Sequence, residues 1–419
     1  MAKKKAPVLT PEERLKQALV PEAEQPYSIP ENWCWIHLLN AFDNRTDSKK
    51  KIQQKNYLKN GTFSIVDQGQ EIVGGYTNDS NMIYDGALPV IIFGDHTRCI
   101  KYIDFPFAQG ADGVKVLKPY NIWDAECFYY AFQSIDIPNM GYRRHYPLFL
   151  NFSIPLPPLP EQRRIVFRIE SLFAKLDEAK EKLQAVIDGH EPRRAAILHR
   201  AFTGELTARW RVNKGTSFTD WRDELLKNVT TRITAGGDKP EDFTELWDEC
   251  HKIPVVANGV SNDGIIGYTS QARVTGATVT VAGRGTIGHA IFRAYPYYPV
   301  VRLIVIEVQN CLDARYLRCV FEEYPEKGTG SSIPQLTVPV VKEKRLPVPP
   351  IEEQQEIVRI LDSLFAKEQQ VLAAAQAALA QIDVIKKSIL ARAFRGELGT
   401  NDPAEESAAN LIATLLREG

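Results

Sequence analysis

Residues 155–206 read PLPPLPEQRRIVFRIESLFAKLDEAKEKLQAVIDGHEPRRAAILHRAFTGEL, and residues 347–398 read PVPPIEEQQEIVRILDSLFAKEQQVLAAAQAALAQIDVIKKSILARAFRGEL. The two stretches align without a gap at a constant offset of 192 residues (347 − 155 = 192). They share the block Ser-Leu-Phe-Ala-Lys, at 171–175 and 363–367, and both end in Gly-Glu-Leu. Chance does not account for such a match, so the sequence indicates an internal duplication.

A weaker repeat precedes each of these stretches. Trp33 aligns with Trp221, and Asp124 aligns with Asp313, at nearly the same offset. Because such pairs are spread over the whole half-chain, we expect two complete copies of one unit. The first part of each copy has diverged, and the second part has been kept.

Each repeated stretch has the apolar spacing of a coiled-coil helix, with intervals alternating between four and three residues. Gly204 and Gly396 are expected to end the two helices, and Gly189 and Pro192 to kink the first. An ordinary helical hairpin inside one core is the alternative, but two equivalent helices can also pair antiparallel. The expected seam runs through Ile165, Ile169, Leu172, Leu176, Ala179, Leu183 and Val186, and through Ile357, Leu361, Leu364, Val371, Ala375, Ala378, Ile382, Ile385 and Ile389, interrupted at Glu368.

The predicted fold class is α+β, with two mixed α/β domains held at opposite ends of a long antiparallel two-helix coiled coil and an internal pseudo-two-fold repeat. Strand-like patterns and one helix-like stretch, near 124–134 and 312–323, support a mixed α/β domain in each copy. The strand-like patterns lie at 62–66, 88–93, 253–257, 277–282 and 300–308. The predicted segments are 1–25, with a short helix after the capping box Thr10-Pro-Glu-Glu13; 26–154, the first domain; 155–206, the first helix; 207–345, the second domain; 346–399, the second helix; and 400–419, an acidic tail.

The composition is that of an ordinary globular protein, with 44% hydrophobic and 25% charged residues. The formal net charge of −1 means that any nucleic-acid surface must arise from local clustering of cations. Six scattered cysteines contain no Cys-x-x-Cys pair and suggest neither a zinc site nor disulfides, so we expect a cytoplasmic protein. No apolar run approaches the roughly 20 residues that span a bilayer, and no membrane partner is expected.

Several motifs in order make this chain resemble the specificity subunit of type I restriction–modification systems. The resemblance extends from about residue 30 to 398 and is strongest at Pro-Leu-Pro-Pro-Leu-Pro-Glu-Gln (155–162) and Ala-Phe-Thr-Gly-Glu-Leu (201–206), each with its second copy. The first domain carries Phe-Gly-Asp-His-Thr-Arg (93–98), Ala-Asp-Gly (111–113) and Gly-Tyr-Arg-Arg-His-Tyr (141–146), which look like one class of target-recognition domain. The second carries Ala-Gly-Arg-Gly-Thr-Ile-Gly (282–288) and Gly-Thr-Gly-Ser-Ser-Ile-Pro-Gln-Leu (328–336), similar to another class.

The resemblance implies that each target-recognition domain reads one half of a bipartite site in double-stranded DNA. The paired helices then fix the spacer and offer docking surfaces to two adenine-N6 methyltransferase subunits, and the assembly can recruit restriction translocase subunits. This chain is expected to be non-catalytic and to hold no cofactor, with S-adenosylmethionine, ATP and Mg on the partner subunits. In keeping with that, the sequence contains neither a phosphate-binding loop of the Gly-x-x-x-x-Gly-Lys-[Ser/Thr] type nor the Asn-Pro-Pro-[Tyr/Phe] motif of an adenine methylase.

In the first domain, the loop at 141–146 combines two arginines, a histidine and two aromatic residues, and arginine can read guanine or hold a phosphate. A solvated loop with a satisfied histidine is its alternative. The segment 95–98 suggests a structural turn or a base contact, because no nucleophile accompanies it for hydrolysis. A lysine run suits phosphates or is a solvated loop. The DNA-contact candidates are Lys49, Lys50, Lys51, Asp95, His96, Thr97, Arg98, Tyr142, Arg143, Arg144 and His145.

In the second domain, the candidates are Lys239, Arg284, Ser331, Ser332 and Gln335. Gln335 could pair with adenine, or it could cap a loop. Residues 283–288 match the dinucleotide-binding fingerprint in form, but the following residues alternate as in a strand, whereas the fingerprint requires a helix.

Two other functions remain open from the sequence. The chain could serve a methyltransferase–nuclease system without a translocase, or it could be a structural coiled-coil scaffold with two protein-binding domains. Divergent domains on a preserved frame favour recognition over a scaffold.

Overall fold

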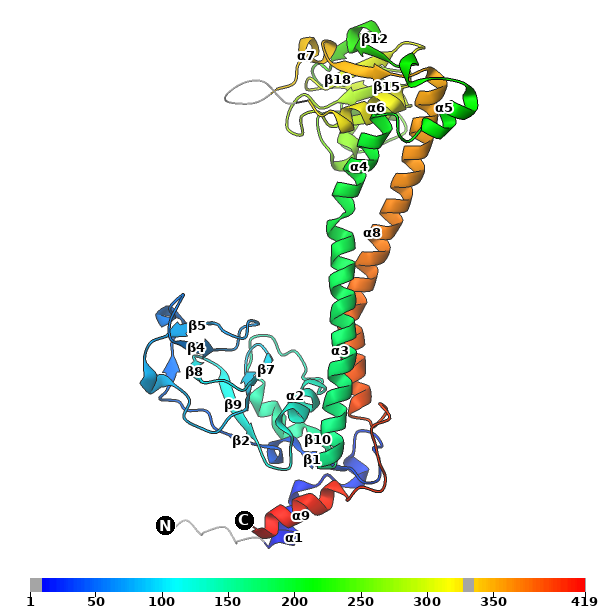
Figure 1. The fold of residues 1–419 in the computed structure, drawn as a ribbon. Helices are drawn as coiled ribbons and strands as arrows, with labels where there is room; N and C mark the ends of the chain where they lie inside the picture. The colour runs from blue at the N-terminus through cyan, green and yellow to red at the C-terminus, as the bar shows by residue number, and fades with distance from the viewer. Residues whose placement is uncertain (1–9, 327–334, 419) are drawn as a thin grey trace. The chain divides into compact units, whose positions relative to one another are not determined.

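The computed structural model describes residues 10–326 and 335–418, and its α+β fold matches the predicted class. Two compact units divide the chain: Met1–Lys182 together with Ala378–Gly419, and Leu183–Ala377. Figure 1 shows that each unit combines a sheet-rich domain with parts of the long helices. None of the helices within the described residues is long and apolar enough to cross a membrane.

The first unit contains three sheets. A four-stranded antiparallel sheet has the order β2 (Phe42–Asn44), β9 (Val114–Pro119), β6 (Val90–Gly94) and β7 (Ile100–Ile103). A second sheet has the order β3 (Lys51–Ile52), β8 (Phe107–Gly110), β4 (Phe63–Val66) and β5 (Gly75–Thr77), with β8 parallel to β3 and β4. Strands β1 (Cys34–His37) and β10 (Ser153–Leu156) pair antiparallel beside α2 (Ala125–Gln133).

Within the described residues, the second unit repeats this topology, except that its second sheet has three strands where the first unit has four. Its four-stranded sheet has the order β12 (Thr230–Ala235), β18 (Ile304–Val308), β15 (Thr278–Val281) and β16 (Ala290–Arg293). Its other sheets are β14 (Ile265–Thr269), β13 (Ile253–Val256) and β17 (Tyr298–Pro299), and the pair β11 (Arg222–Leu225) and β19 (Arg345–Val348). Helix α6 (Ala314–Glu323) stands where α2 does, and the short α7 (Val338–Lys342) precedes β19. The shared strand order confirms the predicted internal repeat.

The long helices are α3 (Leu159–Asp188), α4 (His190–Phe202) and α8 (Ile351–Ala393). Gly189 separates α3 from α4, as predicted, while hydrogen bonds from Gly189 N to Ala185 O (3.0 Å) and from Arg193 N to Gly189 O (3.1 Å) carry the chain across the break. Gly204 and Gly396 follow the helix ends with φ of 77° and 76°, a left-handed conformation that glycine adopts without strain.

Within the first unit, the beginning of α3 packs antiparallel on the end of α8. Ile165, Ile169 and Phe394 belong to one core, and Lys386 Nζ lies 5.0 Å from the centre of the Phe173 ring. Within the second unit, the equivalent pairing joins α4 to the beginning of α8, where Arg194 lies 3.8 Å from the centre of the Phe365 ring. Phe173 and Phe365 are related by the offset of the repeat, as are Arg194 and Lys386. Each unit therefore has a cation over the equivalent phenylalanine ring, lysine in the first and arginine in the second.

The predicted seam of α8 was wrong in its middle part. Val371, Ala378 and Ile385 are exposed, whereas Leu372 and Leu379 are partly buried. The error arose because Glu368 was treated as an interruption. Glu368 belongs to the seam, since its carboxylate accepts a hydrogen bond from Arg193 Nε at 2.9 Å, and the alternation of four and three continues through it.

The helices nearest the two termini pack together in the first unit. Helix α1 (Pro11–Ala18) begins with the predicted capping box, in which Thr10 and Glu13 bond to each other's backbone N–H groups. It packs against α9 (Ala408–Glu418), so the segment predicted as an acidic tail contains a helix that packs within the first unit. Arg164 holds this segment to α3 through two hydrogen bonds to Glu405, of 2.7 and 2.9 Å.

Candidate nucleic-acid interface

Each domain is fastened to its helix by a buried glutamine. The Gln162 side chain accepts a hydrogen bond from Asp124 N at 2.6 Å and donates to the carbonyl oxygens of Ile122 and Pro157, both at 2.9 Å. Asp124 in turn caps α2. In the second unit, Gln354 makes the same three bonds, to Asp313 N and to the carbonyls of residues 311 and 349, and Asp313 caps α6. The repeated Gln and Asp therefore make the same connection between domain and long helix in both units.

A buried glutamate beside each glutamine holds the repeated tryptophan. Glu161 accepts a hydrogen bond from Trp33 Nε1 at 2.6 Å, and Glu353 accepts one from Trp221 Nε1 at 2.9 Å. Both carboxylates are fully buried. They differ in their remaining partners, because Glu353 forms an ion pair with Arg211 of α5 (Ala208–Lys214).

In the first domain, the predicted loop 141–146 is held on the turn after β6. The carbonyl of Asp95 accepts from both His145 N and His145 Nδ1 at 2.8 Å, and the Asp95 carboxylate accepts from Tyr146 N at 2.7 Å. His145 Nε2 accepts from Met140 N at 3.1 Å, so the proton of the ring is on Nδ1. Asp95 and His145 are buried, with their polar atoms engaged. Because both side chains are buried, we infer that they position the loop, and a direct contact of either with DNA stays a prediction.

His96 and Tyr142 form a stacked pair on the surface of this turn. Their ring centres are 4.8 Å apart with an interplanar angle of 13°, and His96 Nδ1 lies 3.1 Å from the Tyr142 carbonyl oxygen. The Tyr142 side chain is 85% exposed. The structure therefore brings together two predicted residues that are 46 positions apart in the chain.

Gln68, which the sequence did not single out, supports the same turn. Its side-chain oxygen accepts from His96 N at 3.3 Å, and its carbonyl accepts from Thr97 Oγ1 at 2.6 Å. Arg98 has a left-handed backbone (φ 61°) and donates to the Ile137 carbonyl at 2.8 Å, which engages part of its guanidinium. A glutamine between two strands has no local signal, so only the fold could reveal its role.

Lys101 anchors the segment that carries Gln68. Its ammonium group is buried, donates to the Glu71 carbonyl and lies 3.7 Å from Asp67 Oδ1. Burial lowers the pKa of Lys101, because the charged form is disfavoured away from water, and the nearby Asp67 opposes that shift. The cation is therefore structural and does not face solvent.

Arg143 and Arg144 are the most available cations of this loop. Both are exposed, and neither guanidinium is bonded to another side chain within residues 10–326 and 335–418. Their donors are free to meet a guanine edge or a phosphate.

The lysine run at 49–51 is divided by the structure. Lys49 is exposed, and Lys51 lies in β3. Lys50 donates to Asp85 at 2.8 Å and to the Ile83 carbonyl at 3.3 Å. The hydrogen bond from Lys50 to the Asp85 carboxylate lowers the pKa of Asp85, because it favours the charged form. Lys49 is therefore freer than Lys50 to contact a phosphate.

In the second domain, Gln335 lies between two arginines. Its side-chain oxygen accepts from Arg284 Nη2 at 3.2 Å and from Arg302 Nη1 at 3.4 Å. Arg302 was missed because 300–308 was expected to be one strand. In the structure β18 begins only at Ile304, and Arg302 lies in the preceding turn with φ 59°. Ser331 and Ser332 lie outside the described residues.

The other predicted residue of this domain, Lys239, is exposed and has its ammonium 4.0 Å from the centre of the Phe243 ring. The glycine-rich stretch 283–288 leads into β16, the strand that the sequence predicted there. Asn258 holds this stretch, accepting from Gly283 N at 2.8 Å and donating to the Val301 carbonyl at 2.6 Å.

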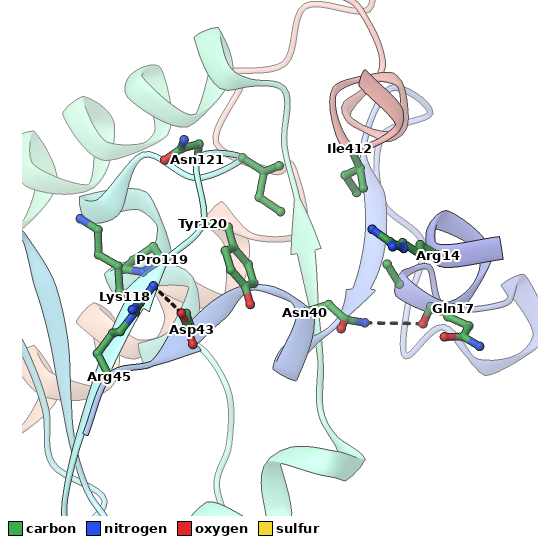
Figure 2. Close-up of a pocket in the computed structure, with 12 residues that line it drawn as sticks. Arg14, Gln17, Asn40, Asp43, Arg45, Lys118, Pro119, Tyr120, Asn121 and Ile412 are labelled. Atoms are coloured by element: carbon green, nitrogen blue, oxygen red, sulfur yellow. Dashed lines mark hydrogen bonds and ion pairs between the residues drawn. The ribbon is translucent and has the colours of Figure 1, made fainter. Parts of the chain in front are cut away.

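A pocket of about 630 Å³ in the first unit contains none of the predicted residues (Figure 2). It lies between α1 and the edge formed by β2 and β9, and Arg45 pairs with Asp43 on its wall at 2.8 Å. Its lining residues include no histidine, cysteine or serine. Within the described part of the chain, no three His, Cys, Asp or Glu residues are grouped to hold a metal ion, and all six cysteines are free.

Comparison with known proteins places this architecture in a family. A family model described as the type I restriction modification DNA specificity domain matches residues 220–377. The C-terminal part of a predicted type I specificity subunit of Mycoplasma pneumoniae is 37% identical over 99 residues, which are 24% of this chain and 68% of that protein. The specificity subunit of the type I restriction enzyme EcoBI of Escherichia coli is 27% identical over 90% of this chain and 87% of its own length.

Two further Mycoplasma pneumoniae relatives are matched over 45% and 55% of their length, so the chain spans about half of each. The crystal structure of the HsdS subunit from Thermoanaerobacter tengcongensis has the same fold, with a TM-score of 0.61 at 20% identity, over 90% of this chain and all of that one. The fold and the repeat define a two-domain subunit built on paired helices. The chain belongs to the family of type I restriction–modification specificity subunits.

Proposed function

We propose that this chain reads a bipartite site in double-stranded DNA, one half-site with each recognition domain. The observation that carries the proposal is the contrast within each unit. The Gln, Asp, Glu and Trp of the frame repeat, and both glutamines make the same three hydrogen bonds. The exposed loops, in contrast, carry different cations in different geometry. Divergent loops on a repeated frame are what two readers of different sequences require.

The available cations suit both parts of DNA recognition. Arg143 and Arg144 in the first domain, and Arg302 in the second, are exposed side chains on turns. Arginine pairs with the O6 and N7 atoms of guanine, and lysines such as Lys49 contribute sequence-independent phosphate contacts. This division of roles allows affinity despite the formal net charge of −1.

The family further suggests that the chain acts by positioning other subunits and is not itself a catalyst. Two adenine-N6 methyltransferase subunits would bring S-adenosylmethionine, and restriction translocase subunits would bring ATP and Mg. The proposed compartment is the cytoplasm, and the proposed recognition domains remain 26–154 and 207–345.

The decisive experiment pairs genome-wide mapping of N6-methyladenine with a gel-shift titration of the chain and its methyltransferase. The expected result is a motif of two short half-sites with a fixed spacer, and specific binding to duplexes that contain it. A complex with no preference for that motif at moderate salt would overturn the proposal and favour a protein-binding scaffold. Omitting the translocase subunits tests whether they are needed for cleavage.

A second experiment tests whether the paired helices set the spacer. Matched seven-residue insertions, one near 182 in α3 and one near 377 in α8, preserve the heptad seam and lengthen each helix by about 10 Å. If the helices are a ruler, the preferred spacer should grow by roughly 3 base pairs, at ~3.4 Å each. An unchanged spacer with intact binding would refute the ruler.

A further inference from the structure

We propose that Tyr142 is a wedge whose ring inserts into the base stack of the DNA half-site bound by the first domain, with His96 as its support. The inference rests on the proposed function. It assigns to Tyr142 a distortion of the DNA, in addition to the contacts proposed for the other loop residues. It follows from the exposure of Tyr142, the stacking of its ring and the rigidity of the turn beneath it.

One face of the Tyr142 ring is covered by His96, and the other face is open to solvent. Its inner face stacks almost parallel on the His96 ring, at 4.8 Å between centres and 13° between planes, yet the side chain is 85% exposed. Isolated apolar residues on a surface need no explanation. A large aromatic side chain held flat on a second ring, with the outer face free, has the geometry on which a base stacks.

The supporting ring is itself fixed. His96 N donates to the Gln68 side chain at 3.3 Å, and His96 Nδ1 lies 3.1 Å from the Tyr142 carbonyl, so both its backbone and its ring are held. Gly113 lies directly against it, because a Cβ at Gly113 would come within 2.7 Å of His96 Cδ2. Stacking on this ring therefore requires little loss of side-chain freedom on binding.

The residues at the two ends of the loop, Gly141 and His145, direct Tyr142 outward. Gly141 has φ 67° and open space around it, which reverses the chain immediately before the tyrosine. His145, buried and bonded to Asp95 and Met140, fixes the other end of the loop. Gly141 before the tyrosine and the buried His145 after it therefore hold the ring at a defined place above the turn.

The neighbours of Tyr142 suit insertion into a duplex. Arg143 and Arg144 follow it directly and are exposed, so Arg143 can hold a phosphate that flanks an opened base step while Arg144 reads a base. Proteins that insert side chains between base pairs kink the duplex in this manner, and the cost of unstacking is offset by the added contacts. The competing interaction is a hydrogen bond from the Tyr142 hydroxyl to a base edge, which needs no unstacking.

The test uses the full chain with its methyltransferase and duplexes that carry 2-aminopurine, one position at a time, across the first half-site except at the methylated adenine. The wild-type complex should give increased fluorescence at one base step. Tyr142→Ala should abolish this increase and weaken specific binding roughly 10-fold. Tyr142→Phe is the matched control and should retain both, because stacking needs the ring and not the hydroxyl.

His96→Ala should reduce the fluorescence increase while Tyr142 remains, as expected of a positioning residue. Specific binding without any increase in fluorescence would overturn the wedge and leave the proposed function intact. Equal losses in Tyr142→Phe and Tyr142→Ala would also overturn it, in favour of a hydroxyl contact. A wild-type complex that does not discriminate among sequences would instead remove the proposed function, and the wedge with it. Because Tyr142 is exposed, its variants should unfold at the wild-type temperature, which serves as the folding control.

Discussion

Glu161 and Glu353 occupy the same place in the two copies of the repeat, yet their carboxylates are stabilised by different partners. Each is fully buried and accepts a hydrogen bond from the repeated tryptophan. Glu353 completes its shell with the guanidinium of Arg211 and the Thr207 hydroxyl. Glu161 uses neutral donors instead, the Asn401 amide at 2.8 Å and the Thr400 hydroxyl at 3.2 Å.

The difference follows from what succeeds each Gly-Glu-Leu. After 204–206 the chain forms α5 and returns Arg211 to the carboxylate, whereas after 396–398 it passes Glu161 as a non-helical segment that contains turns before it reaches α9. The repeated frame thus specifies a buried carboxylate and its tryptophan, and the divergent segment supplies the remaining donors. One unit has a buried ion pair and the other has a set of neutral hydrogen bonds.

The largest expected effect comes from replacing Glu353, with the equivalent replacement of Glu161 as its comparison. Glu353→Gln leaves Arg211 buried without its counter-charge and should lower the free energy of unfolding by about 3–5 kcal/mol. Glu161→Gln removes no ion pair and should cost only about 1 kcal/mol. Urea unfolding followed by tryptophan fluorescence measures both. Equal losses in the two variants would show that the ion pair adds nothing to the frame.

The glutamines should behave alike where the glutamates differ. Gln162→Met and Gln354→Met each deprive one backbone N–H of its acceptor and two carbonyls of their donor. We expect each to lower the free energy of unfolding by about 2–3 kcal/mol, because buried polar groups are left unsatisfied. The same urea titrations apply. Clearly unequal losses of unfolding free energy would mean that the two glutamines do not play the same structural role.

The loops should separate the two domains in function. Arg144→Ala should reduce discrimination at one half-site by about 1–3 kcal/mol per lost guanine contact, and Arg302→Ala should do so at the other. Competition gel shifts with duplexes mutated in one half-site at a time provide the measurement. If either variant weakened both half-sites equally, the domains would not be independent readers.

The smallest effect is expected in the lysine run. Lys49→Ala should reduce the salt dependence of non-specific DNA binding by roughly one unit in the slope of log K against log salt. Lys50→Ala is the matched control and should change the slope less, because Lys50 is already paired with Asp85. Binding measured between about 50 and 200 mM salt distinguishes them. The same slope for both variants would indicate that the pair with Asp85 opens on DNA.

Sequence reasoning succeeded where the signal was local or repeated. The capping box at Thr10 and the division of the first helix at Gly189 depend on neighbouring residues, and the match of Asp124 with Asp313 follows from the repeat. It failed where a polar residue had a distant partner. Glu368 was excluded from the seam because its ion pair with Arg193, 175 positions away, is invisible in the chain.

The sequence by itself determined the duplication, the α+β class and the helical frame, because repeats and periodicity are properties of order along the chain. Only the tertiary structure decided which predicted loop residues are accessible. It buried Asp95 and His145, stacked His96 on Tyr142 and brought Gln68 and Arg302 to the loops. The reason is physical: accessibility and hydrogen-bond partnership depend on which strands lie side by side, and residues 68, 96 and 142 become neighbours only when β6 and its flanking loops pack together.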